Sequence, residues 1–293
     1  MRAVGAGVRW PLSGSLTRSC VHSVFDVMSG QAVLAAQAVG DGIPVVFLHA
    51  AVCDRRMWRA QLDGLGASYR AIAYDRRGAG DTRAEPATHS AVADLIAVLD
   101  AAAGDAPAVL VGCSQGARVA LDAALMHPAR VRGLVLISPT VAGAPEAVLA
   151  PAMQALMQSL KAAEAAGDID RVNALKARLF LDGPLAAEGR VGGVLREQFL
   201  DMNGRVLRAA PVGVSADAVP AFDRLSECQA PTLVAWGSLD FPHIQERARL
   251  VAARLPHGTP WEVAGAAHLP SLERPADFTA RIAAFIRRPD GAA

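Results

Sequence analysis

Long apolar runs are missing from this sequence of 293 residues, although 52% of its residues are hydrophobic. No run approaches the roughly 20 residues that a membrane-spanning helix requires, so we expect no membrane partner. Runs of lysine and arginine are also missing, and the formal net charge is only +1. The sequence therefore offers no electrostatic footprint for nucleic acid.

Cysteine is scarce and scattered. The four cysteines, Cys20, Cys53, Cys113 and Cys228, are far apart and form no CxxC pair. This spacing predicts reduced thiols in a cytoplasmic protein, with neither a disulfide framework nor a zinc site.

The first 27 residues lack both an acidic residue before Asp26 and the apolar core of a signal peptide, but include Arg2, Arg9 and Arg18. A transit peptide has this composition. The alternatives are a disordered extension, or an upstream start codon with Met28 as the working start. In each case we expect residues 1–27 to lie outside the fold.

From residue 28 onward, apolar strand patterns alternate with helical patterns. Strands are predicted at 44–49, 69–74, 108–111, 133–138, 231–236 and 260–263, and helices between and after them, including 90–103, 244–255 and 275–287. This alternation predicts an α/β fold with a mostly parallel, doubly wound sheet and helices on both faces. We assign residues 28–138 and 220–293 to this core.

The alternation stops between residues 139 and 219. This segment is rich in Ala, Leu, Arg and Glu, has helical periodicity, and contains no strand-like run. Gly167-Asp168, Asp182–Pro184 and Asn203-Gly204 divide it into three or four predicted helices. We interpret residues 139–219 as a helical cap inserted into the core.

Residues 108–116 join a buried strand pattern to a nucleophile motif. The apolar run is followed by Gly112-Cys-Ser114-Gln-Gly116, which matches G-x-S-x-G, and then by a helical pattern that extends to Met126. A sharp turn brings backbone close to positions 112 and 116, where a Cβ would clash. The order strand, turn, helix predicts a nucleophile elbow that presents Ser114, with the Cys113 side chain in the core.

A serine nucleophile requires a base and a group that orients the base. Asp240 follows the predicted strand 231–236, and His268 follows the predicted strand 260–263, so both lie at carboxyl ends of strands. The rival acids Asp217 and Asp223 follow no predicted strand. Among the rival bases, His257 lies at the opposite end of the sheet, and His243 is too close to Asp240. The order Ser114, Asp240, His268 is the one expected of the α/β-hydrolase arrangement.

Five segments together resemble the α/β-hydrolase superfamily, in the group of enol-lactonases, esterases and cofactor-free haloperoxidases. They are Phe47–His49 with the small-residue loop after it, Tyr74–Thr82, His127–Val131, Gly237–Asp240 and Ala267–Glu273. The resemblance covers roughly residues 32–288. It implies a catalytic triad of Ser114, His268 and Asp240, with no metal and no organic cofactor.

The same resemblance implies an oxyanion hole formed by the backbone N–H groups of Ala51 and Gln115. The sequence departs from the family pattern at Ala50, where glycine is usual, and at Thr82, where serine is common. Gln115 replaces the frequent methionine or histidine and is a candidate substrate contact. His49 is a second candidate, with a structural role in the loop as the alternative. Trp58 is a third, either as pocket wall or as core.

We therefore expect a monomeric or homodimeric hydrolase that cleaves an ester or lactone of a small-molecule substrate through an acyl-enzyme. C–C bond hydrolysis or perhydrolysis on the same triad is an alternative. A small-molecule sensor and a non-hydrolytic biosynthetic enzyme on the same fold are further alternatives, and they rest on fold analogy alone.

Overall fold

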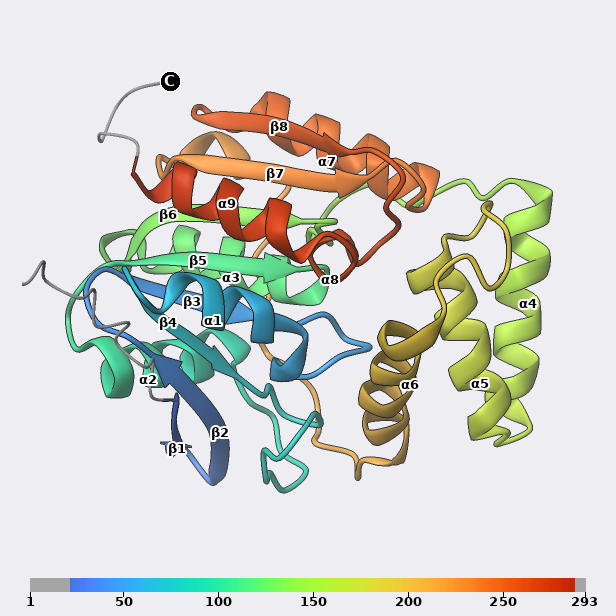
Figure 1. The fold of residues 1–293 in the computed structure, drawn as a ribbon, viewed down its shortest axis with the longest axis horizontal. Coiled ribbons are helices and arrows are strands. Elements are labelled where there is room, and N and C mark those ends of the chain that lie inside the picture. The colour runs from blue at the N-terminus through green and yellow to red at the C-terminus, as the bar shows by residue number, and fades with distance from the viewer. Residues whose placement is uncertain (1–21, 288–293) are drawn as a thin grey trace, which may run out of the picture.

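The computed structural model describes residues 22–287 and contains one twisted sheet with helices on both faces (Figure 1). Its strands lie in the order β1-β2-β4-β3-β5-β6-β7-β8. The pairs β1–β2 and β2–β4 are antiparallel, and all other neighbours are parallel. The strands are β1 (His22–Ser29), β2 (Ala32–Val39), β3 (Pro44–Leu48), β4 (Arg70–Tyr74), β5 (Ala108–Cys113), β6 (Val131–Ile137), β7 (Thr232–Gly237) and β8 (Gly258–Val263). The predicted doubly wound sheet is confirmed.

Every residue of the central strands β3 and β5 is buried, which explains why their sequences read as unbroken apolar runs rather than alternating patterns. One apolar cluster contains alternate strand residues and the helices α2 (Ala91–Ala103), α3 (Gln115–Met126) and α7 (Pro242–Arg254). The cluster on the opposite face contains the other strand residues and the helices α1 (Arg59–Leu65), α8 (Pro270–Glu273) and α9 (Pro275–Ile286).

A helical insertion separates β6 from β7. It consists of α4 (Pro151–Ala165), α5 (Ile169–Lys176), a π-helical turn (Ala177–Asp182) and α6 (Gly193–Arg208). Figure 1 shows these helices gathered at the end toward which the parallel strands point. None of the helices between residues 22 and 287 has the length and hydropathy of a membrane span.

The predicted break at Asn203-Gly204 is wrong, because both residues lie inside α6. Asn203 Nδ2 donates to Asn173 Oδ1 of α5 at 2.7 Å. A Cβ at Gly204 would lie 3.2 Å from Asn173 Nδ2. The Asn203 amide bonds across the contact, and the missing side chain of Gly204 lets the two helices approach closely. The sequence Asn-Gly is also typical of turns, which explains the wrong prediction.

The prediction that residues 1–27 lie outside the fold is wrong for residues 22–27. They belong to β1, which pairs with β2 along its whole length from His22 to Ser29. Only Val27 of this strand is buried, so the strand has no apolar stripe that sequence reasoning could detect. The preceding residues, 1–21, lie outside the described part of the chain.

Candidate active site

The turn between β5 and α3 holds Ser114 at φ 54° and ψ −113°, a backbone conformation that is costly for a residue with a side chain. A Cβ at Gly112 would lie 2.4 Å from the Gly116 carbonyl oxygen. A Cβ at Gly116 would lie 2.2 Å from the carbonyl oxygen of Leu48. Because both obstacles are backbone atoms, no side-chain movement relieves them, and the turn requires both glycines.

Asp240 and His268 follow the neighbouring strands β7 and β8, and their side chains meet. His268 Nδ1 lies 2.8 Å from Asp240 Oδ1 and 3.1 Å from Oδ2, and both residues are buried. Oδ1 also accepts a hydrogen bond from the Phe241 N–H at 2.7 Å. Since a carboxylate only accepts, Nδ1 carries the proton and Nε2 is left as an acceptor.

The loops that carry this pair approach each other closely. A Cβ at Gly237 would lie 2.1 Å from the Ala267 carbonyl oxygen, so glycine at the end of β7 lets the His268 loop pass. The Cys113 thiol lies 3.8 Å from the His268 carbonyl oxygen, which places the His268 backbone beside the residue that precedes Ser114. His268 Nε2 is buried and has no hydrogen-bond partner within residues 22–287. The structure therefore joins Asp240 to His268 directly and brings His268 next to the elbow, with no hydrogen bond to Ser114.

The rival acid Asp217 and the Cys113 thiol beside Ser114 have other roles. Asp217 accepts from Ser90 Oγ at 2.5 Å and from the Val92 N–H at 3.1 Å at the start of α2. Burial raises the pKa of the Cys113 thiol well above its ordinary value, so this thiol stays protonated and is a poor nucleophile.

Two phenylalanine rings surround the candidate base. The ring centroid of Phe180 lies 5.1 Å from that of His268, and the centroid of Phe241 lies 5.9 Å from it. The two phenylalanine rings also contact each other, at 5.5 Å between centroids. Phe180 belongs to the π-helical turn of the helical insertion. Neither contact could be predicted from the sequence, since an apolar residue in either place gives no signal of its contact.

Both ring nitrogens of His49 form hydrogen bonds with backbone groups. Its Nε2 accepts a hydrogen bond from the Arg76 N–H at 2.9 Å, so Nδ1 donates to the Ala50 carbonyl oxygen at 2.8 Å. Burial, and then the positive charge of Arg76, hold the pKa of His49 well below its ordinary value. The ring is therefore neutral and fixes the loop after β3. It has no free nitrogen for a substrate, which favours the structural alternative.

Trp58 is buried and packs against another aromatic ring. Its side chain has no exposed surface, and its ring packs on Phe47 at 5.2 Å between centroids. This packing favours the core alternative for Trp58 over the pocket wall. Nothing in a single sequence distinguishes a core tryptophan from one that lines a pocket.

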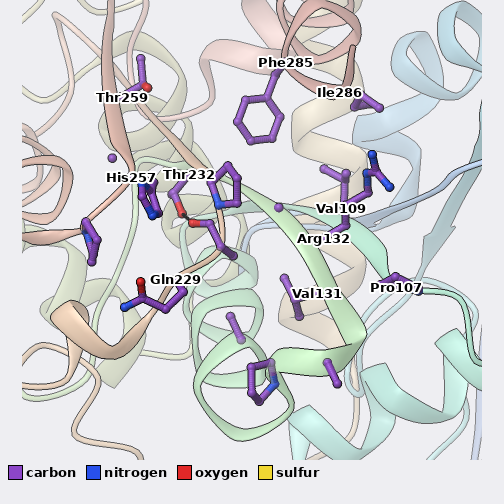
Figure 2. Close-up of a pocket in the computed structure, with 18 of the residues that line it drawn as sticks. Pro107, Val109, Val131, Arg132, Gln229, Thr232, His257, Thr259, Phe285 and Ile286 are labelled. Atoms are coloured by element: carbon purple, nitrogen blue, oxygen red, sulfur yellow. Dashed lines mark hydrogen bonds between the residues drawn. The ribbon is translucent and has the colours of Figure 1, made fainter. Parts of the chain in front are cut away.

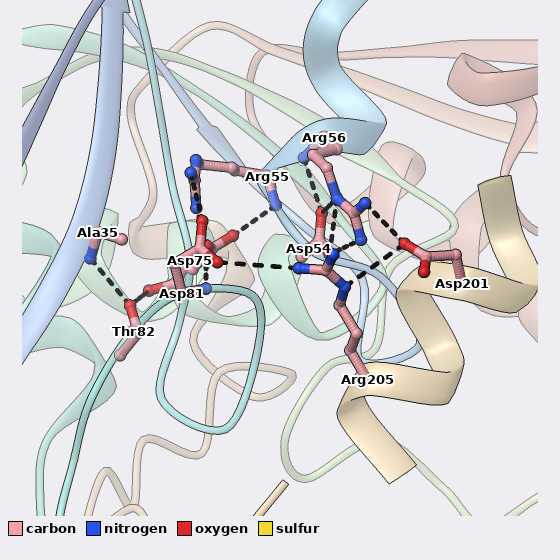
Figure 3. A network of polar contacts seen from close by, with 9 residues as sticks. All are labelled: Ala35, Asp54, Arg55, Arg56, Asp75, Asp81, Thr82, Asp201 and Arg205. Carbon is pink, nitrogen blue, oxygen red and sulfur yellow. Dashed lines mark hydrogen bonds and ion pairs between the residues drawn. The ribbon is translucent and has the colours of Figure 1, made fainter. Parts of the chain in front are cut away.

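Alternating acids and arginines connect the loop after β3, the loop after β4 and α6 (Figure 3). Asp75 is buried and accepts from the backbone N–H groups of Arg55 at 2.7 Å and Asp81 at 2.8 Å, and it pairs with the Arg55 guanidinium. Arg56 pairs with Asp54 at 2.7 Å and with Asp201 of α6 at 2.6 Å. These bonds fix the two loops and attach the helical insertion to them.

In the loop 74–82, Thr82 occupies the position where serine is common and makes the hydrogen bonds that hold the turn. Its hydroxyl donates to the Asp75 carbonyl oxygen at 2.6 Å and accepts from the Ala35 N–H at 3.0 Å. Serine has the same hydroxyl, so the departure at this position is conservative.

Two cavities lie at opposite ends of the sheet. A cavity of about 780 Å³ is lined by residues that precede the parallel strands, including Pro107, Val131 and Thr232, and by Phe285 of α9 (Figure 2). It is far from the strand ends that carry Ser114, Asp240 and His268. A cavity of about 240 Å³ lies at the carboxyl ends, where Ala51 and Gln115 are among its lining residues. Between residues 22 and 287, no three His, Cys, Asp or Glu side chains gather as metal ligands.

The known proteins that are similar to this chain include the following three. An acetyltransferase component of the acetoin cleaving system from Cupriavidus necator is 28% identical, over 87% of this chain and 67% of the relative. Epoxide hydrolase 2 from Siraitia grosvenorii is 41% identical over 107 residues, and this chain spans only about a third of its length, 34%. A solved thermophilic esterase from Thermogutta terrifontis, with malate bound, has a TM-score of 0.72 and 25% identity, over 90% of this chain and 98% of that one.

The family assignment rests on the match that covers most of the sheet. The profile of the alpha/beta hydrolase family matches residues 45–282, which include β3 to β8, the elbow at Ser114 and the pair Asp240–His268. The chain belongs to the alpha/beta hydrolase family.

Proposed function

We propose that this protein is a serine hydrolase that cleaves an ester or lactone of a small molecule through Ser114, His268 and Asp240. The observation that carries the proposal is the buried pair of His268 Nδ1 and Asp240 Oδ1, which leaves Nε2 unpaired in a residue whose backbone lies beside the elbow. An imidazole held in this way accepts a proton from a serine hydroxyl and returns it to a leaving group.

In the proposed reaction, Ser114 Oγ attacks the acyl carbon while His268 Nε2 takes the hydroxyl proton. Asp240 stabilises the imidazolium, which then protonates the leaving oxygen and so releases the alcohol. A water molecule, deprotonated by the same nitrogen, attacks the acyl-enzyme and frees the acid.

The tetrahedral oxyanion would accept hydrogen bonds from the N–H groups of Ala51 and Gln115. Neither N–H has a hydrogen-bond partner within the described range 22–287. A donor of this kind typically contributes about 10²- to 10³-fold in rate. Ala50 is not among the described residues with a positive φ, so alanine at that position is compatible with this role.

We further propose that the helical insertion, within residues 139–219, is a cap over this site. Phe180 from the insertion contacts His268, and the Arg56–Asp201 pair attaches α6 to the loop that carries Ala51. A cap of this kind shields the site from bulk solvent and shapes the acyl pocket. The buried free thiols Cys53, Cys113 and Cys228 fit a cytoplasmic location.

The proposal is tested by mass spectrometry of the intact protein after reaction with a fluorophosphonate. We expect one adduct on the wild type, none on Ser114→Ala, and a much slower reaction for His268→Ala, because the hydroxyl is unreactive without its base. Hydrolysis of p-nitrophenyl pentanoate should be lost in the same two variants.

Ser138→Ala is the matched control. Ser138 directly follows the neighbouring strand β6, is buried and also has a positive φ, of 46°, and its hydroxyl has no hydrogen-bond partner among residues 22–287. This variant should keep the adduct. An unlabelled wild type with a native circular dichroism spectrum would rule out the proposed nucleophile.

A further inference from the structure

Two polar side chains without partners line the cavity of about 240 Å³ at the carboxyl ends of the strands. Tyr74 ends β4, and Arg76 lies in the loop that follows. The cavity is also lined by Ala51 and Gln115, the two proposed oxyanion donors, and is bounded by Val206 of α6. Its volume is below the roughly 300 Å³ at which whole-ligand pockets begin, so it suits one end of a small substrate.

Arg76 is the arginine of this region that lacks a counter-charge. Its neighbours are matched, since Arg55 pairs with Asp75, Arg56 with Asp54, and Arg77 makes two bonds of 2.8 and 2.9 Å to Asp94. Arg76 forms no ion pair within the described residues, and its Nε is buried with no hydrogen-bond partner. The residue as a whole is only partly buried, but a cation with a buried, unpartnered nitrogen is costly, so this position favours an anion from outside the chain.

The ionisable groups around Arg76 do not supply that anion. The groups whose charges would act on that of Arg76 are Tyr74, Cys53 and Cys113. Burial raises the pKa of all three, so they are neutral at pH 7. Asp94 lines the same cavity, but both of its oxygens are bound by Arg77. His49, the remaining neighbour, is neutral and fully bonded.

The Tyr74 hydroxyl is a second unpaired donor in the same cavity. Its side chain has no exposed surface, and its oxygen has no hydrogen-bond partner among residues 22–287. A buried hydroxyl without a partner costs about 1–3 kcal/mol. Arg76 and Tyr74 both line this small cavity, and a guanidinium with a phenol is a donor pair suited to a carboxylate.

We propose that Arg76 and Tyr74 bind a carboxylate on the acyl part of the substrate, whose ester or lactone carbonyl faces Ala51 and Gln115. The inference rests on the function proposed above and narrows the substrate class to esters or lactones that carry a carboxylate. Arg76 is then a specificity-determining residue. The loop itself is held by Asp75 and by the Arg76 backbone N–H, so the guanidinium is not needed for its structure.

The test compares two esters that differ only in one terminal group. Mono-p-nitrophenyl glutarate carries a carboxylate where p-nitrophenyl pentanoate carries a methyl group. We expect the wild type to have the higher kcat/KM for the glutarate ester. Arg76→Gln should lower the ratio of the two kcat/KM values about 10- to 100-fold, the range of a hydrogen bond to a charged group. Tyr74→Phe should lower it less, and Arg76→Lys should restore part of it.

Arg59→Gln is the control for net charge. Arg59 has a side chain 83% exposed on α1, outside the cavity, so its removal should leave the ratio unchanged. Thermal unfolding separates binding from a structural role. Because the Arg76 guanidinium has no partner between residues 22 and 287, Arg76→Gln should unfold at the same temperature as the wild type or higher, whereas a structural role predicts a lower temperature.

The two proposals fail in different ways. If the wild type turns over both esters and Arg76→Gln does not change the ratio, the carboxylate site is wrong and the hydrolase stands. If the wild type turns over neither ester and forms no fluorophosphonate adduct, the hydrolase is wrong. In that case calorimetry with glutarate decides on the cavity. Binding to the wild type but not to Arg76→Gln supports the carboxylate site, and equal or absent binding overturns it.

Discussion

At the scale of single residues, Asp122 on α3 shows what a buried carboxylate costs. Its side chain is buried, Oδ1 has no partner among the described residues, and Oδ2 lies 3.5 Å from Arg118 Nε. Burial raises the pKa of Asp122 to about 6, and the nearby Arg118 offsets only part of this. The folded protein therefore holds this proton more tightly than the unfolded chain, whose carboxylate has a pKa near 3.8.

This difference makes stability depend on pH in a definite direction. Between about pH 4 and pH 6 the folded state binds more protons, so ionisation of Asp122 lowers the free energy of unfolding as the pH rises. Asp122→Asn should therefore be more stable than the wild type at pH 8, by about 1–3 kcal/mol, and equally stable at pH 4. Urea unfolding at both pH values measures this, and a less stable variant at pH 8 would contradict it.

Some features of individual site residues could be predicted from the sequence, and others could not. The pair Asp240–His268 was predictable, because a carboxylate and an imidazole after successive strands meet at one sheet edge. The unpaired state of Arg76 was not predictable. It depends on which arginine takes which carboxylate, and Asp75 binds Arg55 across 20 residues of sequence. Trp58 was undecided for a similar reason, since its burial depends on Phe47.

At the scale of elements, α5 and α6 are joined by a pair of buried amides. Asn203 donates to Asn173 Oδ1, and Asn173 Nδ2 donates to the Leu200 carbonyl oxygen at 2.9 Å. Asn173→Ala would leave the buried amide of Asn203 without a partner, which costs about 1–3 kcal/mol. We expect a loss of that size in the free energy of unfolding, measured with urea.

Gln154→Ala on α4 is the comparison for this prediction. Gln154 is exposed, and its single bond is to the Leu149 carbonyl oxygen, so its removal should cost at most about 0.5 kcal/mol. If both variants lose the same stability, the amide pair does not hold the two helices together.

Some strands and helices could be predicted from the sequence more readily than others. The strands β3 and β5 were evident because burial on both faces makes them apolar throughout. The edge strand β1 was missed, since its alternate positions face solvent on one side and little core on the other. The Asn203-Gly204 prediction failed because a contact with α5, remote in sequence, overrode the local turn preference of these residues.

At the scale of the whole molecule, β1 completes the antiparallel end of the sheet. β1 pairs with all of β2, residues 32–39, whereas β4 pairs only with residues 36–39. A chain that begins at Met28 would keep only the pairs of Met28 and Ser29 with β2, and would expose the rest of that side of β2 as a new edge. We expect its unfolding midpoint to fall by about 5 °C or more relative to the full chain.

Light scattering would complement the thermal measurement, because an open edge strand pairs readily with another copy. The chain from Met28 should associate at concentrations where the full chain does not. Equal midpoints and equal masses would show that β1 contributes little, and would leave Met28 suitable as a start.

The candidate nucleophile and its base are separated by 154 positions, since one lies at residue 114 and the other at 268. During synthesis, the elbow leaves the ribosome long before the loop that bears the imidazole. A nascent chain of this protein would thus not react at Ser114 until nearly all of it has emerged. Reaction with a fluorophosphonate would then report completed folding, and could time the last step of folding on the ribosome.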